Sequence, residues 1–302
     1  MKKTIIFSLL SFAVNTVSAQ YVHIKLSDGS RYDIDSRTIE SMTVDNNATV
    51  TPDTPGGTEM PPAVKVEGQV TIGGVTYTRT VGGTVGIAVD LGLPSGTLWA
   101  DRNVGASSPK EYGAYIMWGE VGAKEEKYVN GMKENYGWPA YKYSPDGSWG
   151  GLTKYTCPDN QTAGMWYSNG RFVGDGKTVL ESVDDAATVN WGKDWVMPTI
   201  VQIEELNNSA YTTWYWTTKD GVSGYEVRSR KNGNSIFLPA SGYHLADMFV
   251  LEGIRGFYWS SSLNKGYSDD ARYLNLSADG RRMDYDVERC NGFSVRPVRA
   301  KE

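Results

Sequence analysis

The segment Gly256-Phe257-Tyr258-Trp259-Ser260-Ser261 places three aromatic residues between small ones, in the last quarter of a chain of 302 residues. Its composition resembles that of Ser235-Ile236-Phe237-Leu238-Pro239. Branched and aromatic residues bounded by Gly, Pro or Ser are typical of a strand in a packed sheet. Two further runs, 271–277 and 281–287, flank Asp279-Gly280 and predict a hairpin with a glycine-containing turn. Residues 234–299 therefore predict a sheet of short antiparallel strands.

Alternation along the 271–287 hairpin assigns its side chains to two faces, because successive residues of a strand point to opposite sides. The apolar residues, which we expect to point into the core, are Leu274, Leu276, Met283 and Val287. The residues expected on the other face are Tyr273, Asn275, Arg282, Asp284 and Asp286. This mixture of Tyr, Asn, Asp and Arg suits a binding surface, and it also fits a solvated strand face. The sequence leaves both interpretations open.

Upstream, the run Val89-Asp90-Leu91-Gly92-Leu93-Pro94-Ser95-Gly96-Thr97-Leu98-Trp99-Ala100 closely resembles the opening of the "major paralogous domain" family of exported Bacteroidetes proteins. Further motifs that resemble this family follow in one order, so that the resemblance covers residues 89–299. These motifs are Asn103-Val104-Gly105-Ala106, Trp118-Gly119-Glu120, Asp184-Asp185-Ala186-Ala187, Trp195-Val196-Met197-Pro198-Thr199, Gly233-Asn234-Ser235-Ile236-Phe237-Leu238-Pro239-Ala240, Tyr258-Trp259-Ser260-Ser261-Ser262 and Ser294-Val295-Arg296-Pro297-Val298-Arg299.

The resemblance implies a C-type lectin-like fold, an α+β domain with short antiparallel strands, two helices and a long irregular insertion. Such domains present a variable surface on a fixed frame. The frame residues that we expect here are Leu98, Trp99, Trp195, Phe237, Trp259, Val295 and Val298. The family implies binding and supplies no catalytic residues to transfer. The ligand-binding residues that we predict are Tyr267, Asp269, Arg272, Tyr273, Asn275, Arg282, Asp284, Tyr285, Asp286 and Arg289.

The N-terminal residues predict export. Met1-Lys2-Lys3 precedes an apolar run over 4–14, and Val17-Ser18-Ala19 forms a small-residue cleavage site. A signal peptide over 1–19 is therefore expected, with secretion, the outer cell surface or the periplasm as the destination. After it we expect a small β segment over 20–45, a Pro- and Gly-rich linker over 46–63 and the lectin-like domain over 64–302.

Composition limits the partners. With 40% hydrophobic and 22% charged residues, the chain can bury a substantial core, and its formal net charge of −5 gives no positive footprint for nucleic acid. No stretch after the signal peptide is long and apolar enough to span a membrane. Neither nucleic acid nor a membrane span is therefore expected, and the partner that the family resemblance implies is an extracellular glycan or protein ligand.

Residues 120–176 lack regular periodicity and are rich in Gly, Asn, Tyr and Trp. A long irregular insertion of this kind in a compact domain is usually functional, and its exposed aromatics could stack on sugar rings. The alternative is that these aromatics hold the insertion down as a satellite core. Two helices are expected after the insertion. Ser182 is expected to cap the helix over 183–190, and Thr199 with Gln202 predicts a capping box for the helix over 200–206.

Residues for catalysis and metal binding are sparse. The chain has two histidines, His23 and His244, and neither lies near a nucleophile elbow; there is also no zinc-ligand cluster and no phosphate-binding loop. We predict no enzyme activity and no cofactor. The lectin-like superfamily that the resemblance implies includes a formylglycine-generating oxidase branch, which is the residual enzyme alternative, but the isolated Cys157 and Cys290 do not reproduce its active-site cysteine pattern. Cys157 and Cys290 are isolated, so separate thiols are favoured over a disulfide. Calcium remains a lesser alternative. Its candidate ligands are Asp269, Asp270, Asp284, Asp286 and Glu288.

Two functional hypotheses follow. The first is an exported, non-enzymatic, adhesin-like protein that binds a glycan or protein ligand at the cell surface through the C-terminal hairpin face and the 120–176 insertion. Its rigid frame would limit the entropy cost of binding. The second is a structural or assembly subunit of a surface appendage or extracellular matrix. Arg296 and Arg299 are expected to be structural, tying the last strand to buried carbonyl or carboxylate groups.

Overall fold

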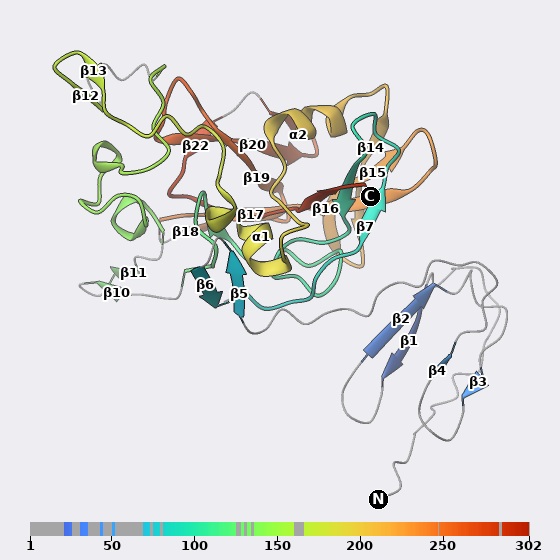
Figure 1. The fold of residues 1–302 in the computed structure, drawn as a ribbon. Coiled ribbons are helices and arrows are strands. Elements are labelled where there is room, and N and C mark those ends of the chain that lie inside the picture. The colour runs from blue at the N-terminus through green and yellow to red at the C-terminus, as the bar shows by residue number, and fades with distance from the viewer. Residues whose placement is uncertain are drawn as a thin grey trace, which may run out of the picture. The chain divides into compact units, whose positions relative to one another are not determined.

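The computed structural model describes residues 81–124, 136–159, 166–246, 248–283 and 286–301 with their side chains, and some further strands as backbone only. The chain divides into two compact units, Met1–Val64 and Lys65–Glu302 (Figure 1). The expected signal peptide, the expected linker apart from one short strand, and the residues Asp284 and Tyr285 lie outside the described residues.

The strands described as backbone only form antiparallel pairs, β1 with β2, β3 with β4, β5 with β6 and β10 with β11. The first two pairs belong to the N-terminal unit, where the sequence predicts a hairpin at 21–34. Their bounds are β1 (Tyr21–Lys25), β2 (Arg31–Asp35), β3 (Thr43–Val44), β4 (Val50–Thr51), β5 (Gln69–Ile72), β6 (Val75–Thr78), β10 (Tyr128–Val129) and β11 (Met132–Lys133).

The largest sheet among the described residues has the order β21-β20-β19-β17-β23-β9, with β18 beside β17 and β22 also beside β20. Its pairs are antiparallel except for β17 and β19, which run parallel where Gly242 lies opposite Gly256. The strands are β9 (Ile116–Met117), β17 (Ser241–Leu245), β18 (Met248–Glu252), β19 (Arg255–Leu263), β20 (Asp270–Ser277), β21 (Gly280–Arg282), β22 (Asp286–Glu288) and β23 (Gly292–Phe293).

Two three-stranded sheets, β14-β15-β16 and β24-β8-β7, and two α-helices complete the described elements of this unit, together with the β12-β13 hairpin and three 3₁₀ turns. The fold is thus α+β and mostly β, as predicted at that level. The bounds are β7 (Ala88–Asp90), β8 (Thr97–Ala100), β12 (Tyr167–Ser168), β13 (Arg171–Phe172), β14 (Thr212–Lys219), β15 (Val222–Ser229), β16 (Ser235–Pro239), β24 (Val298–Ala300), η2 (Trp138–Ala140), η3 (Trp149–Gly151), η4 (Ser182–Asp184), α1 (Ala186–Trp191) and α2 (Ile200–Asn207).

The central strands β19 and β20 are buried on both faces. Phe257 and Trp259 belong to one hydrophobic cluster, which we call the first core, whereas Tyr258 between them belongs to another, the second core. Along β20, Tyr273 contributes to the first core and Leu274 to the second. Because adjacent residues of a strand point to opposite faces, the two cores lie on the two sides of one sheet.

This two-sided burial corrects the prediction that Tyr273 binds a ligand, because Tyr273 is a core residue. Its side chain is only 7% exposed, with its ring centroid 5.1 Å from that of Phe293 and 6.0 Å from that of Phe257. Leu274 and Leu276 are buried as predicted. Alternation located the two faces correctly, but only one of them was expected to be covered.

A register shift corrects the predicted position of Val287. Asn275 lies opposite Arg282, and Arg272 lies opposite Asp286, so one extra residue is accommodated between β21 and β22. A shift of one residue reverses the faces of a strand. Met283 therefore packs against the second core, whereas Val287 packs against the first.

The second core is covered by α2 and the β14-β15-β16 sheet. Ile203 and Leu206 of α2 are buried there, and α2 contacts β19 and β20 (Figure 1). The predicted capping box is confirmed: Thr199 Oγ1 accepts from the amide of Gln202, and Gln202 Oε1 accepts from the amide of Thr199.

The cap of α1 differs from the prediction. Ser182 begins the 3₁₀ turn η4, and Asp185 caps the helix by accepting from the amide of Thr188 at 3.0 Å. Asp185 also accepts from the amide of Met197 at 2.8 Å. Three of the four residues at 182–185, Ser182, Asp184 and Asp185, can each cap a helix or form a turn, and this made the sequence signal ambiguous.

The first core is covered by α1 and by much of the 120–176 insertion. Tyr136, Tyr141, Tyr143 and Tyr155 are each at most 7% exposed and belong to this core. Most of the aromatic residues that the structure describes in the insertion therefore hold it against the sheet, in agreement with the satellite-core alternative. The fit is close at Gly292, where a Cβ atom would lie 2.3 Å from the ring of Tyr136.

Arg296 ties the last strands to the rest of the unit, as predicted. It is 1% exposed, and its guanidinium donates to Asn103 Oδ1 (2.7 Å), the carbonyl of Ala100 (3.1 Å) and the carbonyl of Phe237 (2.9 Å). Arg299 lies with its guanidinium 5.5 Å from the ring centroid of Trp195. All seven predicted frame residues are buried.

The two cysteines, Cys157 and Cys290, are free and buried in the first core, so the prediction of separate thiols is confirmed. Burial raises the pKa of the Cys290 thiol. Among the described residues no helix combines the length and the apolar character needed to cross a membrane.

Candidate functional site

A surface pocket lies at the outer end of the three neighbouring strands β19, β20 and β21, and its volume is about 200 Å³. Its lining residues carry two guanidinium groups, one carboxylate, one amide and one hydroxyl. They are Arg255, Asn275, Ser277, Asp279, Gly280 and Arg282. The pocket therefore offers hydrogen-bond donors and acceptors on a shallow surface.

The pocket continues the sheet face that carries the first core. Arg255 is two residues before Phe257 on β19, and Asn275 is two residues after Tyr273 on β20, so these pairs share a face. Phe257 and Tyr273 are buried, whereas Asn275 is half-buried and Arg255 is exposed. On each of the two strands, the same face thus changes from buried to solvent-accessible over two residues.

Strand pairing fixes the positions of the pocket residues. Arg255 lies opposite Ser277, and Asn275 lies opposite Arg282. The turn from β20 to β21 places Gly280 opposite Ser277 with a φ of 141°, a conformation that favours glycine. Asp279 lies in this turn, at the rim of the pocket.

Of the predicted ligand-binding residues, the structure brings Asn275 and Arg282 together in the pocket. The pocket also contains the side chains of Arg255, Ser277 and Asp279, which were not among the predicted ligand-binding residues. Arg255 and Ser277 could have been found by extending the alternation of the buried aromatic residues outward to the strand ends.

The other predicted residues lie elsewhere. Tyr267 is 43% exposed in the loop before β20. Arg272 is half-buried, and its Nη2 donates to the carbonyl of Met283 at 3.1 Å. Asp286 accepts a hydrogen bond from Asn264 Nδ2, and the carbonyl of Asp269 accepts from the amide of Arg289. These four residues do not line the pocket.

The prediction that Arg289 binds a ligand is also wrong, because its side chain is fully buried and cannot lie on a ligand-binding face. Its Nη1 donates to the carbonyls of Lys154 and Tyr155, both at 3.1 Å. The guanidinium also lies 5.5 Å from the ring centroid of Trp118 and 5.4 Å from that of Tyr141. Arg289 therefore joins the insertion to the C-terminal strands, and burial lowers its pKa.

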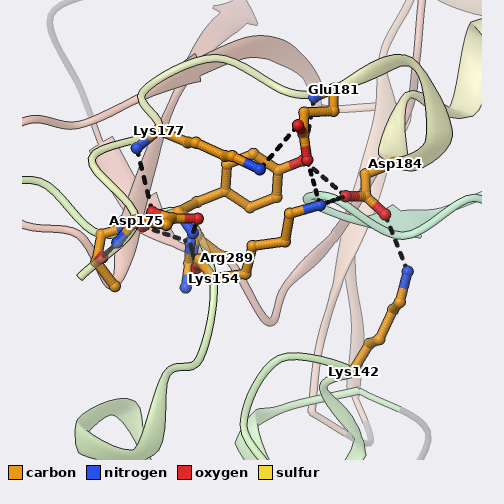
Figure 2. A network of polar contacts seen from close by, with 9 residues as sticks. Lys142, Lys154, Asp175, Lys177, Glu181, Asp184 and Arg289 are labelled. Atoms are coloured by element: carbon orange, nitrogen blue, oxygen red, sulfur yellow. Dashed lines mark hydrogen bonds and ion pairs between the residues drawn. The ribbon is translucent and has the colours of Figure 1, made fainter. Parts of the chain in front are cut away.

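A network of charged residues fixes the insertion to the η4 turn. Figure 2 shows the ammonium of Lys154 between the carboxylates of Glu181 and Asp184, with Lys142 approaching Asp184 from another side. Asp184 is 2% exposed and also accepts from the hydroxyl of Tyr155 at 2.7 Å. Although burial opposes ionisation, Lys154 and the other donors hold the pKa of Asp184 below its usual value.

Asp175 performs a similar role in the same region (Figure 2). Its carboxylate accepts from the amides of Tyr155 and Thr156, both at 2.9 Å, and from the amide of Lys177 at 3.1 Å. These contacts lie within residues 155–177 and satisfy the backbone of an irregular segment, as buried backbone groups require. The charged groups of the insertion thus have a structural use.

Asp270 lies among acidic groups at the start of β20, opposite Glu288 on β22. Burial, followed by the charges of Asp269, Asp286 and Glu288, raises the pKa of Asp270 to about 7. Within the part of the chain that the structure describes, no group of three or more His, Cys, Asp or Glu residues could hold a metal ion. The calcium alternative has no support from the described carboxylates.

The substitution Asp270→Asn is expected to stabilise the protein at pH 8 by about 1–2 kcal/mol, a value reduced because the group is partly exposed. A raised folded-state pKa means that the contribution of Asp270 to stability is fully present below pH 3.8 and is lost as the pH rises through about 7. Urea unfolding at pH 8 and pH 5 measures the effect. The variant and the wild type should differ less at pH 5, and Asp279→Asn, which is exposed, should show no such trend.

Comparison with protein-family models, curated proteins and solved structures found no match. The pocket and the fold around it are therefore the basis for a functional assignment. The family resemblance of residues 89–299 stays a prediction.

Proposed function

We propose that this protein is an exported, non-enzymatic binding protein of the C-type lectin-like type, which recognises an extracellular glycan through the pocket on β19, β20 and β21. The observation that carries this proposal is the change along one sheet face from buried aromatic residues to a polar pocket. Asn275, Ser277, Asp279 and the two arginines supply donors and acceptors of the kind that bind hydroxyl groups.

The packing beneath the pocket supports binding. Leu274 and Leu276, the residues on either side of Asn275, are at most 2% exposed in the second core. The backbone of β20 is therefore fixed by packing on one face of the sheet, while Asn275 lies in the pocket on the opposite face. A binding group on a rigid strand loses little conformational freedom when a ligand binds, so more of the contact energy appears as affinity.

The test is a binding screen on glycan and protein arrays with residues 20–302, the chain expected after signal-peptide cleavage. Asn275→Ala should weaken glycan binding roughly tenfold, the effect of one or two hydrogen bonds. Trp149→Ala is the matched variant on the insertion, because Trp149 is 46% exposed. Thermal unfolding of both variants checks that they fold.

Glycan binding that is lost in Asn275→Ala and kept in Trp149→Ala supports the pocket. The reverse pattern would move the site to the insertion and contradict the proposal. Binding to proteins alone would replace the glycan with a protein ligand.

One observation favours assembly as a second candidate function. On and after β18, Met248, Phe249, Leu251 and Ile254 are between 36% and 59% exposed. Within the described residues β18 pairs only with β17. An exposed apolar edge strand is prone to pair with another chain. Concentration-dependent oligomers in light scattering, lost in Met248→Lys, would support assembly, and a monomer at all concentrations would exclude this route.

A further inference from the structure

The pocket differs in charge from the chain that carries it. The chain has a formal net charge of −5, whereas the pocket combines two arginines, Arg255 and Arg282, with one carboxylate, Asp279. Among the described residues Arg255 forms no ion pair, so no carboxylate there competes with a ligand for its guanidinium. A ligand with a negative charge is therefore favoured over a neutral one.

The arrangement of the two arginines limits the kind of anion. Arg255 is on β19 and Arg282 on β21, with β20 between them, so their backbones are two strand spacings apart, about 10 Å. The side chains of Asn275 and Ser277 lie on the strand between them, on the same face. Cationic groups thus flank neutral hydrogen-bonding groups.

An acidic sugar has the matching pattern, because its ring carries hydroxyl groups beside a carboxylate or a sulfate ester. A guanidinium binds either anion through two parallel hydrogen bonds, which also fixes its orientation. The amide of Asn275 and the hydroxyl of Ser277 can exchange hydrogen bonds with ring hydroxyls. A small inorganic anion would use the arginines and leave these neutral groups without a role.

We infer that the pocket binds an acidic saccharide, with Arg255 and Arg282 contacting its anionic group and Asn275 and Ser277 its hydroxyls. The inference rests on the proposed glycan-binding function and adds the class of glycan. Another pocket among the described residues, of about 340 Å³, includes Tyr211, Arg230 and Lys231 and is separate from this site.

The test uses an array of uronate-, sialate- and sulfate-bearing oligosaccharides, each printed beside its carboxyl-reduced or desulfated counterpart. The proteins are residues 20–302 as wild type, Arg255→Gln, Arg282→Gln and the charge-matched control Arg230→Gln. The wild type should prefer the acidic member of a pair by at least about tenfold, and each pocket variant should lose about ten- to a hundredfold in affinity for it. Arg230→Gln should bind as the wild type does, and added salt should weaken binding.

Equal binding to acidic and neutral members, with wild-type affinity in both pocket variants, would overturn the inference. If Asn275→Ala lost binding to neutral sugars in that case, the proposed glycan-binding function would stand and only the acidic class of glycan would be wrong. If Arg230→Gln lost acidic-sugar binding and neither Arg255→Gln nor Arg282→Gln did, the binding site would be the pocket that includes Arg230, and this would also overturn the inference. A wild type that binds no saccharide would overturn both. Binding that is lost on carboxyl reduction indicates a carboxylate ligand, and binding that is lost on desulfation indicates a sulfate ligand.

Discussion

Replacing Arg296 by alanine is expected to lower the free energy of unfolding by about 3–5 kcal/mol, the range for breaking a buried charged network. The side chain is 1% exposed and donates to three groups from separate segments, on Asn103, Ala100 and Phe237. Removing it leaves a cavity and three buried acceptors without these donors. Urea unfolding at pH 7 measures the loss.

Arg296→Lys distinguishes the guanidinium geometry from the charge. One ammonium cannot donate in the three directions that the planar guanidinium serves, so this variant should recover only part of the stability. The control is Arg228→Ala, because Arg228 is exposed on β15 and makes one ion pair, with Glu226 at 3.4 Å. Equal stability of Arg296→Ala and Arg228→Ala would show that the buried network contributes little.

Replacing Asp184 by asparagine is expected to cost about 2–3 kcal/mol, because hydrogen bonds to a buried charged group are the strong ones. The carboxylate accepts from Lys142, Lys154 and Tyr155 (Figure 2). Asparagine would keep the shape of the side chain but would remove the negative charge that forms ion pairs with Lys142 and Lys154. The loss should be local, since these three donors belong to the insertion.

Amide hydrogen exchange is the measurement that separates local from global loss. Faster exchange at residues 141–156, with little change in β19 and β20, is the expected pattern. Asp146→Asn is the control within the insertion, because Asp146 is exposed and its contacts, to Ser144 and Ser148, are local. A uniform rise in exchange over the whole 65–302 unit would mean that the insertion is not a separate unit of stability.

Local signals predicted local structure well. The capping box of Thr199 and Gln202 is satisfied within four residues, so its sequence pattern was sufficient. The strands at 235–239 and 256–261 were also correct, because their composition is set by burial in the sheet. At Ser182 the prediction failed, since several adjacent capping residues compete and only tertiary packing decides among them.

The candidate site was harder to predict than the fold. Tyr273 and Asn275 share one strand face and one alternation pattern, yet one is buried and the other faces the pocket. The ring of Tyr273 packs against that of Phe293 on another strand, and which positions of a strand are covered in this way is a long-range property. Arg289 shows the same limit, because a cation held by carbonyl groups and aromatic rings has no local signature.

The pairing of the C-terminal strands has a consequence for the timing of folding. β23 lies between β17 and β9, and β24 pairs with β8, about two hundred residues earlier in the chain. Until residues 292–300 have been synthesised, the chain lacks strands that complete two of its sheets, and contacts of such long sequence separation form slowly. The 65–302 unit can therefore complete these two sheets only when its last residues are available, and its folding is expected to be limited by these late, long-range pairings.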